Sequence, residues 1–159
     1  MTRAISGRRL LRSSGLVILV SLWLAVVSAA GAPTRGSVSV AGPALMVGKS
    51  RFGPILFDGR GYALYSFTHD PRGRTTCYRA CAKAWPPYVV RARPTARTGA
   101  RASLVRTTHR RDGRSQATYA GRPLYYYRGD DRPGVILCQN VSEFGGLWLV
   151  LRGSGKPVR

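Results

Sequence analysis

Two copies of a Tyr-x-aromatic-x-x-Asp pattern carry the side chains that could perform acid–base chemistry. Their members are Tyr65, Phe67 and Asp70, and Tyr125, Tyr127 and Asp130. Residues two apart on a strand face the same side of a sheet, so the two aromatic rings of each copy share a face. If the two aspartates meet across a pseudo-twofold axis, they could form an acid–base pair or a cation site. We favour a structural alternative, in which the rings fill the core and each aspartate accepts backbone N–H groups in a turn.

Three cysteines could form a redox centre, a metal site or a disulfide. Cys77 and Cys81 lie one residue further apart than the Cys-x-x-Cys pair of thioredoxin-like centres. Haem attachment would need histidine where Ala82 stands, and the only two histidines do not have zinc-ligand spacing. We therefore predict a local Cys77–Cys81 disulfide and no metal or cofactor. Cys138 is then left over; it could instead pair with either of these cysteines, or with a second molecule.

Two tryptophans follow these motifs at matching places. Trp85 precedes two prolines, and Trp148 follows Gly-Gly-Leu. If exposed, the pair could stack on sugar rings or on docking peptides. Large aromatic residues dominate small cores, so we predict that both are structural. His69 and His109 have no partner pattern, and we assign them to the surface.

These residues belong to an internal repeat. Residues 61–70 align without a gap on residues 121–130, with Gly, Leu, Tyr and Asp identical and Phe67 opposite Tyr127. Each copy then continues through proline and glycine to a cysteine and a tryptophan. The order of these matches indicates one unit used twice.

Short apolar and aromatic runs around glycine-rich turns must position the repeat residues. Such runs occupy residues 54–57, 62–67, 104–108, 116–119, 124–127 and 147–151. Only residues 75–84 have a helical pattern. We predict a mainly β fold of two pseudo-symmetric hairpin-based repeats forming one small domain, residues 45–152, with at most one or two short helices. Residues 33–44 are predicted to be a linker and first strand, and residues 153–159 a disordered tail.

The N-terminal residues 1–32 have the pattern of a secretory signal peptide. A basic head ending at Arg12 precedes an apolar run from Leu16 to Val27 and a small-residue tail, which suits cleavage after Ala29 or Ala30. The alternative is an uncleaved anchor, because residues 13–34 contain no charge and are long enough to span a bilayer. Either interpretation predicts an exported protein, extracellular or in the cell envelope, where disulfides form.

The net charge of +20 predicts attraction to polyanions. For an exported protein these are anionic wall polymers or the membrane surface. The basic residues are scattered, without a basic helix interleaved with aromatics, so no specific nucleic-acid site is predicted. The charge could also reflect composition alone. The leading hypothesis is a non-enzymatic envelope protein that contacts anionic polymers; the alternative is an extracytoplasmic redox or electron-transfer accessory that uses Cys77 and Cys81.

The repeat resembles a known family. The residues that carry the likeness include Ile55-Leu-Phe-Asp58, Leu64-Tyr-Ser-Phe-Thr-His-Asp70, Thr76-Cys-Tyr-Arg-Ala-Cys-Ala-Lys-Ala-Trp-Pro-Pro87, Pro123-Leu-Tyr-Tyr-Tyr127 and Phe144-Gly-Gly-Leu-Trp148. They are similar to the bacterial secreted-repeat family of predicted lipoproteins, whose function is unknown. The resemblance implies an envelope or extracellular location and a duplicated β-rich domain. The chain departs from that family in lacking a lipid-attachment cysteine and in having an apolar Val135-Ile-Leu-Cys138 segment.

Overall fold

The computed structural model describes residues 42–159, so the predicted signal or anchor and most of the predicted linker lie outside the described residues. Within this range the protein is mainly β, as the sequence predicts. The elements are β1 (Ala44–Gly48), β2 (Ile55–Asp58), β3 (Tyr65–Phe67), α1 (Ala80–Ala84), β4 (Thr95–Ala96), a 3-10 turn (Ala102–Leu104), β5 (Val105–His109), β6 (Ser115–Tyr119), β7 (Arg122–Pro123), β8 (Val141–Glu143) and β9 (Gly146–Val150).

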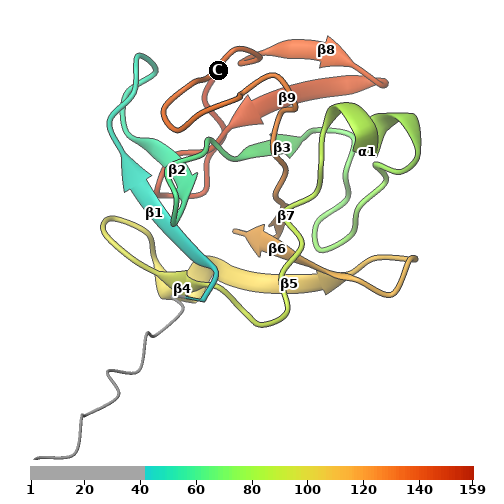
Figure 1. The fold of residues 1–159 in the computed structure, drawn as a ribbon, viewed down its shortest axis with the longest axis horizontal. Helices are drawn as coiled ribbons and strands as arrows, with labels where there is room; N and C mark the ends of the chain where they lie inside the picture. Colours follow the sequence, from blue (N-terminus) through green and yellow to red (C-terminus); the bar gives the residue numbers. More distant parts are fainter. Residues whose placement is uncertain (1–41) are drawn as a thin grey trace, which may run out of the picture. The chain divides into compact units, whose positions relative to one another are not determined.

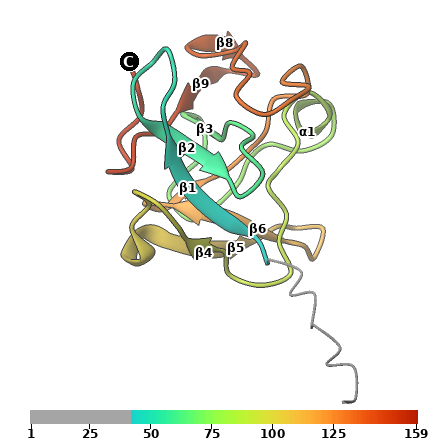
Figure 2. The same ribbon diagram turned by 60° about the vertical axis from the view of Figure 1, so that its left-hand side comes forward.

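The strands form three small sheets around antiparallel hairpins. β1 pairs with β2 and with β4, β5 pairs with β6, which also pairs with β7, and β9 lies between β3 and β8. Figures 1 and 2 show the β8–β9 hairpin and the β5–β6 hairpin at opposite ends of the domain, with β3 between them. Strands β2 and β3 are buried along their whole length and lie inside the domain, whereas most of β5 is exposed.

The two repeats are interleaved rather than side by side. We call residues 44–90 the first repeat and residues 105–151 the second repeat. Strand β3 of the first repeat pairs with β9 of the second, with Tyr65 opposite Val150 and Phe67 opposite Trp148. In the symmetric position, Tyr125 of the second repeat bridges to Pro87 of the first. Proline has no N–H to donate, so this second ladder is shorter.

The hairpins follow the same exchange. The N–H of Leu56 in β2 donates to the carbonyl of Leu151 in the second repeat, at 2.8 Å. Correspondingly, the N–H of Ala117 in β6 donates to the carbonyl of Tyr88 in the first repeat, at 2.9 Å. Each tryptophan-bearing segment therefore completes the sheet of the other repeat, and neither repeat has all its hydrogen-bond partners within itself.

A pair of backbone hydrogen bonds marks the pseudo-twofold axis. The N–H of Tyr65 donates to the carbonyl of Tyr125 at 2.8 Å, and the N–H of Tyr125 donates back at 2.9 Å. Reciprocal bonds of this kind join antiparallel strands that are related by a local twofold. The predicted pseudo-symmetric pair of repeats is thus present, and the two motif tyrosines lie at its centre.

The single α-helix in residues 42–159 is shorter than the predicted segment 75–84. It occupies Ala80–Ala84 and follows Arg79, which has a positive φ of 50°. The residues before it cannot join the helix, because the Thr76 N–H donates to the Asp70 carboxylate and the Cys77 N–H donates to the Thr75 hydroxyl. Side-chain acceptors in this segment compete with the helical hydrogen-bond pattern.

The prediction of a disordered tail at residues 153–159 is wrong. A turn at 153–155 returns the chain, and the N–H of Val158 donates to the carbonyl of Val150 at 2.9 Å. Val158 is 7% exposed and packs in the core beside Ile55 and Trp148. Gly153-Ser-Gly155 form this turn, with Gly155 at a positive φ of 81°.

Candidate functional site

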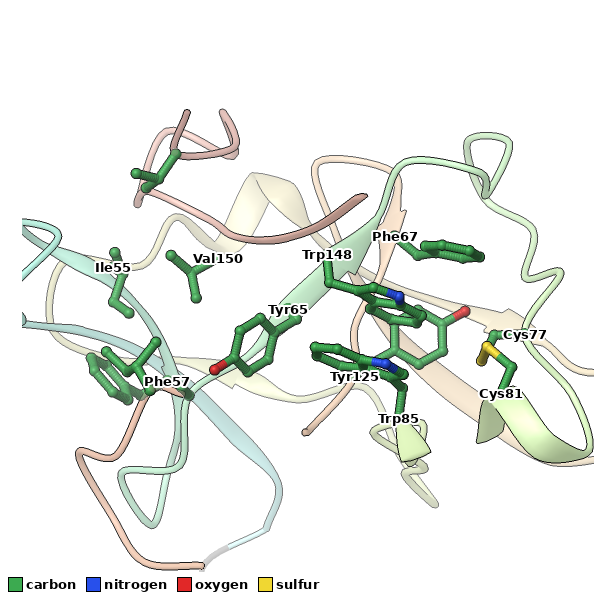
Figure 3. Close-up of a cluster of buried hydrophobic side chains, with 13 residues drawn as sticks. Ile55, Phe57, Tyr65, Phe67, Cys77, Cys81, Trp85, Tyr125, Trp148 and Val150 are labelled. Atoms are coloured by element: carbon green, nitrogen blue, oxygen red, sulfur yellow. A yellow bond between two sulfur atoms is a disulfide. The ribbon is translucent and has the colours of Figure 1, made fainter. Parts of the chain in front are cut away.

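Phe67 and the two tryptophans form a stack of rings at the repeat interface (Figure 3). The rings of Trp85 and Trp148 lie 4.0 Å apart and are nearly parallel, at 2°. Phe67 stacks on the outer face of this pair against Trp148, with centroids 4.2 Å apart, and Tyr127 packs on Trp85 at 4.7 Å. Rings from the first and second repeats therefore alternate through the stack.

The two motif tyrosines contact the same stack edge-on. Tyr65 meets Trp85 with centroids 5.2 Å apart, and Tyr125 meets Trp148 at 5.1 Å. Both tryptophans and both of these tyrosines are fully buried. Edge-to-face and offset-stacked rings are the favoured aromatic geometries and add stabilisation beyond burial alone. Neither tryptophan is available for stacking on a ligand in this arrangement.

The motif aspartates accept hydrogen bonds from the tyrosines of the opposite repeat. The Tyr65 hydroxyl donates to Asp130 Oδ2 at 2.7 Å, and the Tyr125 hydroxyl donates to Asp70 Oδ2. Each aspartate also accepts from the loop that follows it, Asp130 from the Leu137 N–H and Asp70 from the backbone and hydroxyl of Thr76. The turn contacts match the structural interpretation of the sequence, but the exchanged tyrosine donors were not predicted.

Burial sets the protonation behaviour of these four groups. It raises the pKa of Asp70 and of Asp130 above the ordinary value, while their hydrogen-bond donors act in the opposite direction. Burial, followed by the neighbouring carboxylates, also raises the pKa of Tyr65 and of Tyr125. Neither aspartate belongs to the lining of three of the cavities in residues 42–159. The arrangement can join the two repeats.

A buried arginine extends the network on the side of Asp70. The hydroxyls of Tyr125 and Thr75 are hydrogen-bonded to each other, and Arg110 also contacts Thr75. Arg110 is 4% exposed and donates to Gln116 Oε1 at 2.7 Å and to the Cys77 carbonyl at 2.9 Å. These bonds satisfy a guanidinium that would be costly to bury alone.

The cysteines differ between the repeats. Cys77 and Cys81 form a buried disulfide with their Cα atoms 5.3 Å apart. Cys138 is a partly buried free thiol in the corresponding part of the second repeat. Burial, together with the nearby carboxylates of Asp130 and Glu143, raises the pKa of Cys138, so its thiol stays protonated at neutral pH. Among residues 42–159 no group of three or more potential metal ligands lies together.

A cavity of about 650 Å³ lies beside the turn after β2. Its polar lining consists of Asp58, Arg60, Tyr88, Arg97, Arg114 and Tyr126. Burial, and then the charge of Asp58, raises the pKa of Tyr88 to about 12 and also raises that of Tyr126. Sequence reasoning placed residue 126 in the apolar and aromatic run 124–127, and it missed this site. The available signal was Tyr126, which stands where the aligned first copy has Ser66.

A comparison with protein families matches both repeats. The model of a family described as a secreted repeat of unknown function matches residues 46–88 and 106–152, which together make up more than half of the chain. These two matched segments coincide with the two interleaved repeats of the structure. No curated protein and no solved structure matches the chain.

Proposed function

Because the chain belongs to the family of secreted repeats of unknown function, we propose that it is a non-enzymatic protein of the cell envelope that contacts anionic envelope polymers through its basic surface. A secreted protein meets such polymers outside the cytoplasm, where the nucleic acids that attract basic cytosolic proteins are scarce.

The proposal rests on one observation: every acidic side chain of the protein is already paired with another side chain of the domain. The chain has six acidic residues. Asp70, Asp130 and Glu143 accept hydrogen bonds from tyrosine or tryptophan. The other three pair with arginines, namely Asp58 with Arg60, Asp112 with Arg110 and Arg114, and Asp131 with Arg132.

The remaining lysines and arginines of residues 42–159 have no carboxylate within 4.0 Å. Most of these side chains are exposed. Exposed guanidinium groups offer paired N–H donors that match carboxylate and phosphate oxygens. The whole chain, at +20, also attracts polyanions before contact. Both effects favour a dense anionic polymer over a neutral one.

The redox alternative has less support. It needs an accessible sulfur with thiolate character, because the thiolate is the reactive form. Cys77 and Cys81 are joined and buried, and the pKa of Cys138 is raised.

Membrane anchoring rests on residues 13–34, which the structure does not describe. Within the described part of the chain, no helix combines the length and apolar character needed to cross a bilayer. Anchoring therefore remains a proposal, and N-terminal sequencing of the exported protein tests it: a chain that begins at residue 30 or 31 contradicts retention of the anchor.

The polymer contact is tested by retention of the purified protein on anionic wall polymer and on a neutral glucan. We expect retention on the anionic matrix alone, with release as salt rises from about 0.05 to 0.5 M, because exposed charge contacts are screened within about 10 Å at 0.1 M salt. Equal retention on the neutral glucan, or retention on the anionic matrix that is indifferent to salt, contradicts the proposal.

A further inference from the structure

The cavity beside the turn after β2 has three guanidinium groups and one carboxylate in its lining. Arg60 comes from that turn, Arg97 follows β4, and Arg114 precedes β6. One carboxylate, Asp58, faces these three guanidinium groups from the same lining. An excess of fixed cationic donors in a concave site favours a ligand that is anionic and rich in acceptors.

Asp58 does not compete with such a ligand, because its oxygens are already used. Its carboxylate accepts from the N–H and Nε of Arg60, both at 2.9 Å, and from the Tyr62 N–H and the Tyr126 hydroxyl, both at 3.0 Å. Its side chain is 3% exposed. Asp58 therefore positions Arg60 and Tyr126 at the cavity. The sides of these two side chains that face away from Asp58 can contact a ligand.

Arg97 is the cation best placed to receive an anion. It is exposed, and its guanidinium has no acceptor among residues 42–159. Arg114 shares its guanidinium with Asp112, which is not part of the cavity lining.

The rest of the lining is apolar and rigid. It includes Pro86, Pro87 and Val89, and the ring of Tyr126. Val89 is 38% exposed, although it lies next to the buried Tyr88. A sugar ring has apolar C–H faces that pack on surfaces of this kind, while its charged substituent needs donors. A volume of about 650 Å³ also lies within the range of small-ligand sites.

The cavity occurs at only one of the two pseudo-symmetric positions. Tyr126 aligns with Ser66, which is 1% exposed and donates to the Leu149 carbonyl. Asp58 and Arg60 align with Thr118 and Ala120. At the second position the same backbone arrangement is therefore formed with Ser66, Thr118 and Ala120 in place of the tyrosine, the carboxylate and the arginine.

We propose that this cavity binds one acidic sugar unit of an anionic polysaccharide. The guanidinium groups of Arg60, Arg97 and Arg114 receive its carboxylate or phosphate, and the Pro86–Pro87 segment with Tyr126 contacts the ring. This inference rests on the proposed contact with envelope polymers and adds the site and the class of ligand.

Calorimetric titration of the secreted chain with short saccharides tests the ligand class. Trigalacturonate supplies a carboxylate, mannose 6-phosphate a phosphate, and maltotriose is the neutral control. At about 0.15 M salt we expect at least one of the two acidic sugars to bind and maltotriose not to bind. The acidic sugar that binds more tightly shows whether the cavity prefers a carboxylate or a phosphate. Binding of neither acidic sugar, or equal binding of maltotriose or of a short single-stranded DNA, overturns the inference.

Two matched variants test the position. Arg97→Gln removes an exposed guanidinium inside the cavity, and Arg74→Gln removes an exposed one that does not line it. Loss of a charge-assisted hydrogen bond predicts about tenfold weaker binding for Arg97→Gln, against less than about twofold for Arg74→Gln. Val89→Glu places a carboxylate at the cavity and should weaken acidic-sugar binding similarly, with an unchanged melting temperature as the folding check.

The outcomes separate the two proposals. Equal losses in Arg97→Gln and Arg74→Gln, with salt-sensitive retention on wall polymer preserved, overturn the cavity and leave the surface contact standing. Absence of salt-sensitive retention in the unmodified chain contradicts the proposed function itself.

Discussion

The first and second repeats share their skeleton and differ in what surrounds it. Each contributes a hairpin, a motif segment and a tryptophan segment, and each gives its tyrosine hydroxyl to the aspartate of the other. Around this common part the first repeat has a disulfide and a short helix before Trp85. The second has the β8–β9 hairpin and a free thiol before Trp148.

The difference distinguishes residues that both repeats need for folding from residues that occur in one repeat and can bind a ligand. The shared tyrosine, aspartate and tryptophan positions are buried contacts between repeats. Among the unshared positions, Tyr126, Asp58 and Arg60 gather at one cavity. In a duplicated domain, departures from internal symmetry therefore point to function more directly than the repeated motif does.

The largest expected effect comes from separating the repeats. Fragments 42–100 and 101–159 should each be unfolded alone, because each lacks the strand and the tryptophan that complete it. Mixed in equal amounts, they should recover the β-sheet circular dichroism signal. A second fragment carrying Trp148→Ala should fail to rescue the first. A fragment that folds by itself would contradict the interleaved account.

Truncation of either tryptophan is the next largest perturbation. Trp85→Ala and Trp148→Ala should each lower the free energy of unfolding by about 3–5 kcal/mol, because both rings are fully buried in one stack. Urea unfolding measures this. Trp85 also donates to Glu143 at 2.7 Å, so Glu143→Gln is the control that isolates this hydrogen bond from ring packing. A small loss for either tryptophan would show that the stack does not join the repeats.

Removing the hydroxyl of one motif tyrosine at a time compares the two tyrosine–aspartate hydrogen bonds between the repeats. Tyr65→Phe should destabilise by about 2 kcal/mol, because it leaves a buried charged acceptor with one fewer donor. Tyr125→Phe should cost less at its carboxylate, since Asp70 keeps two donors from Thr76 while Asp130 keeps only the Leu137 N–H. A double-mutant cycle with Asp130→Asn measures the coupling for Tyr65, and the reverse ranking would contradict this assignment.

Replacing the cysteines should also affect the two repeats unequally, with smaller losses in the free energy of unfolding than the changes above. Replacing both Cys77 and Cys81 by alanine should cost up to about 2 kcal/mol, as expected for closing so short a loop. Cys138→Ala is the matched control and should change the free energy of unfolding by less than about 0.5 kcal/mol. Iodoacetamide should react slowly with Cys138 at neutral pH, because the pKa of its thiol is raised. Fast alkylation in the folded state would contradict this environment.

The smallest effect is a pH dependence that both aspartates share. Their pKa values are raised from 3.8 on folding, so above pH 3.8 the folded chain holds more protons than the unfolded chain. The stability that they contribute is therefore present at low pH and is lost as pH rises through the raised values. Asp112 acts in the opposite sense below pH 3.8, since Arg114 lowers its pKa. Urea unfolding of Asp70→Asn and Asp130→Asn from about pH 3.5 to 6.5 should show a flatter profile; an unchanged slope would contradict the burial effect.

Much of the fold follows from the sequence because the repeat is visible in it. Alternating residues, glycine-rich turns and the alignment of 61–70 on 121–130 predict a mainly β, duplicated domain. The exchange of segments is not predictable in this way. Pairing of β3 with β9 joins residues far apart in the chain, and local periodicity contains no information on which strand lies next to which.

The candidate sites show the same limit. The turn role of the aspartates and the adjacency of Cys77 and Cys81 are local, so spacing indicates them. The tyrosine donors to Asp70 and Asp130, and the joining of Arg60, Arg97 and Arg114 around one cavity, depend on that long-range pairing. The tail at residues 153–159 is a different case, since it pairs through a short turn with Val150, eight residues before Val158.

The exchange of segments also has a consequence for the order of biosynthesis. Leu56 in the first hairpin receives its carbonyl partner from Leu151, so the first repeat has no finished structure to adopt until residue 151 has been made. Long-range pairing of this kind also slows folding. If the chain is exported unfolded, both effects favour export, because the first repeat stays open until the strand that completes it has crossed the membrane.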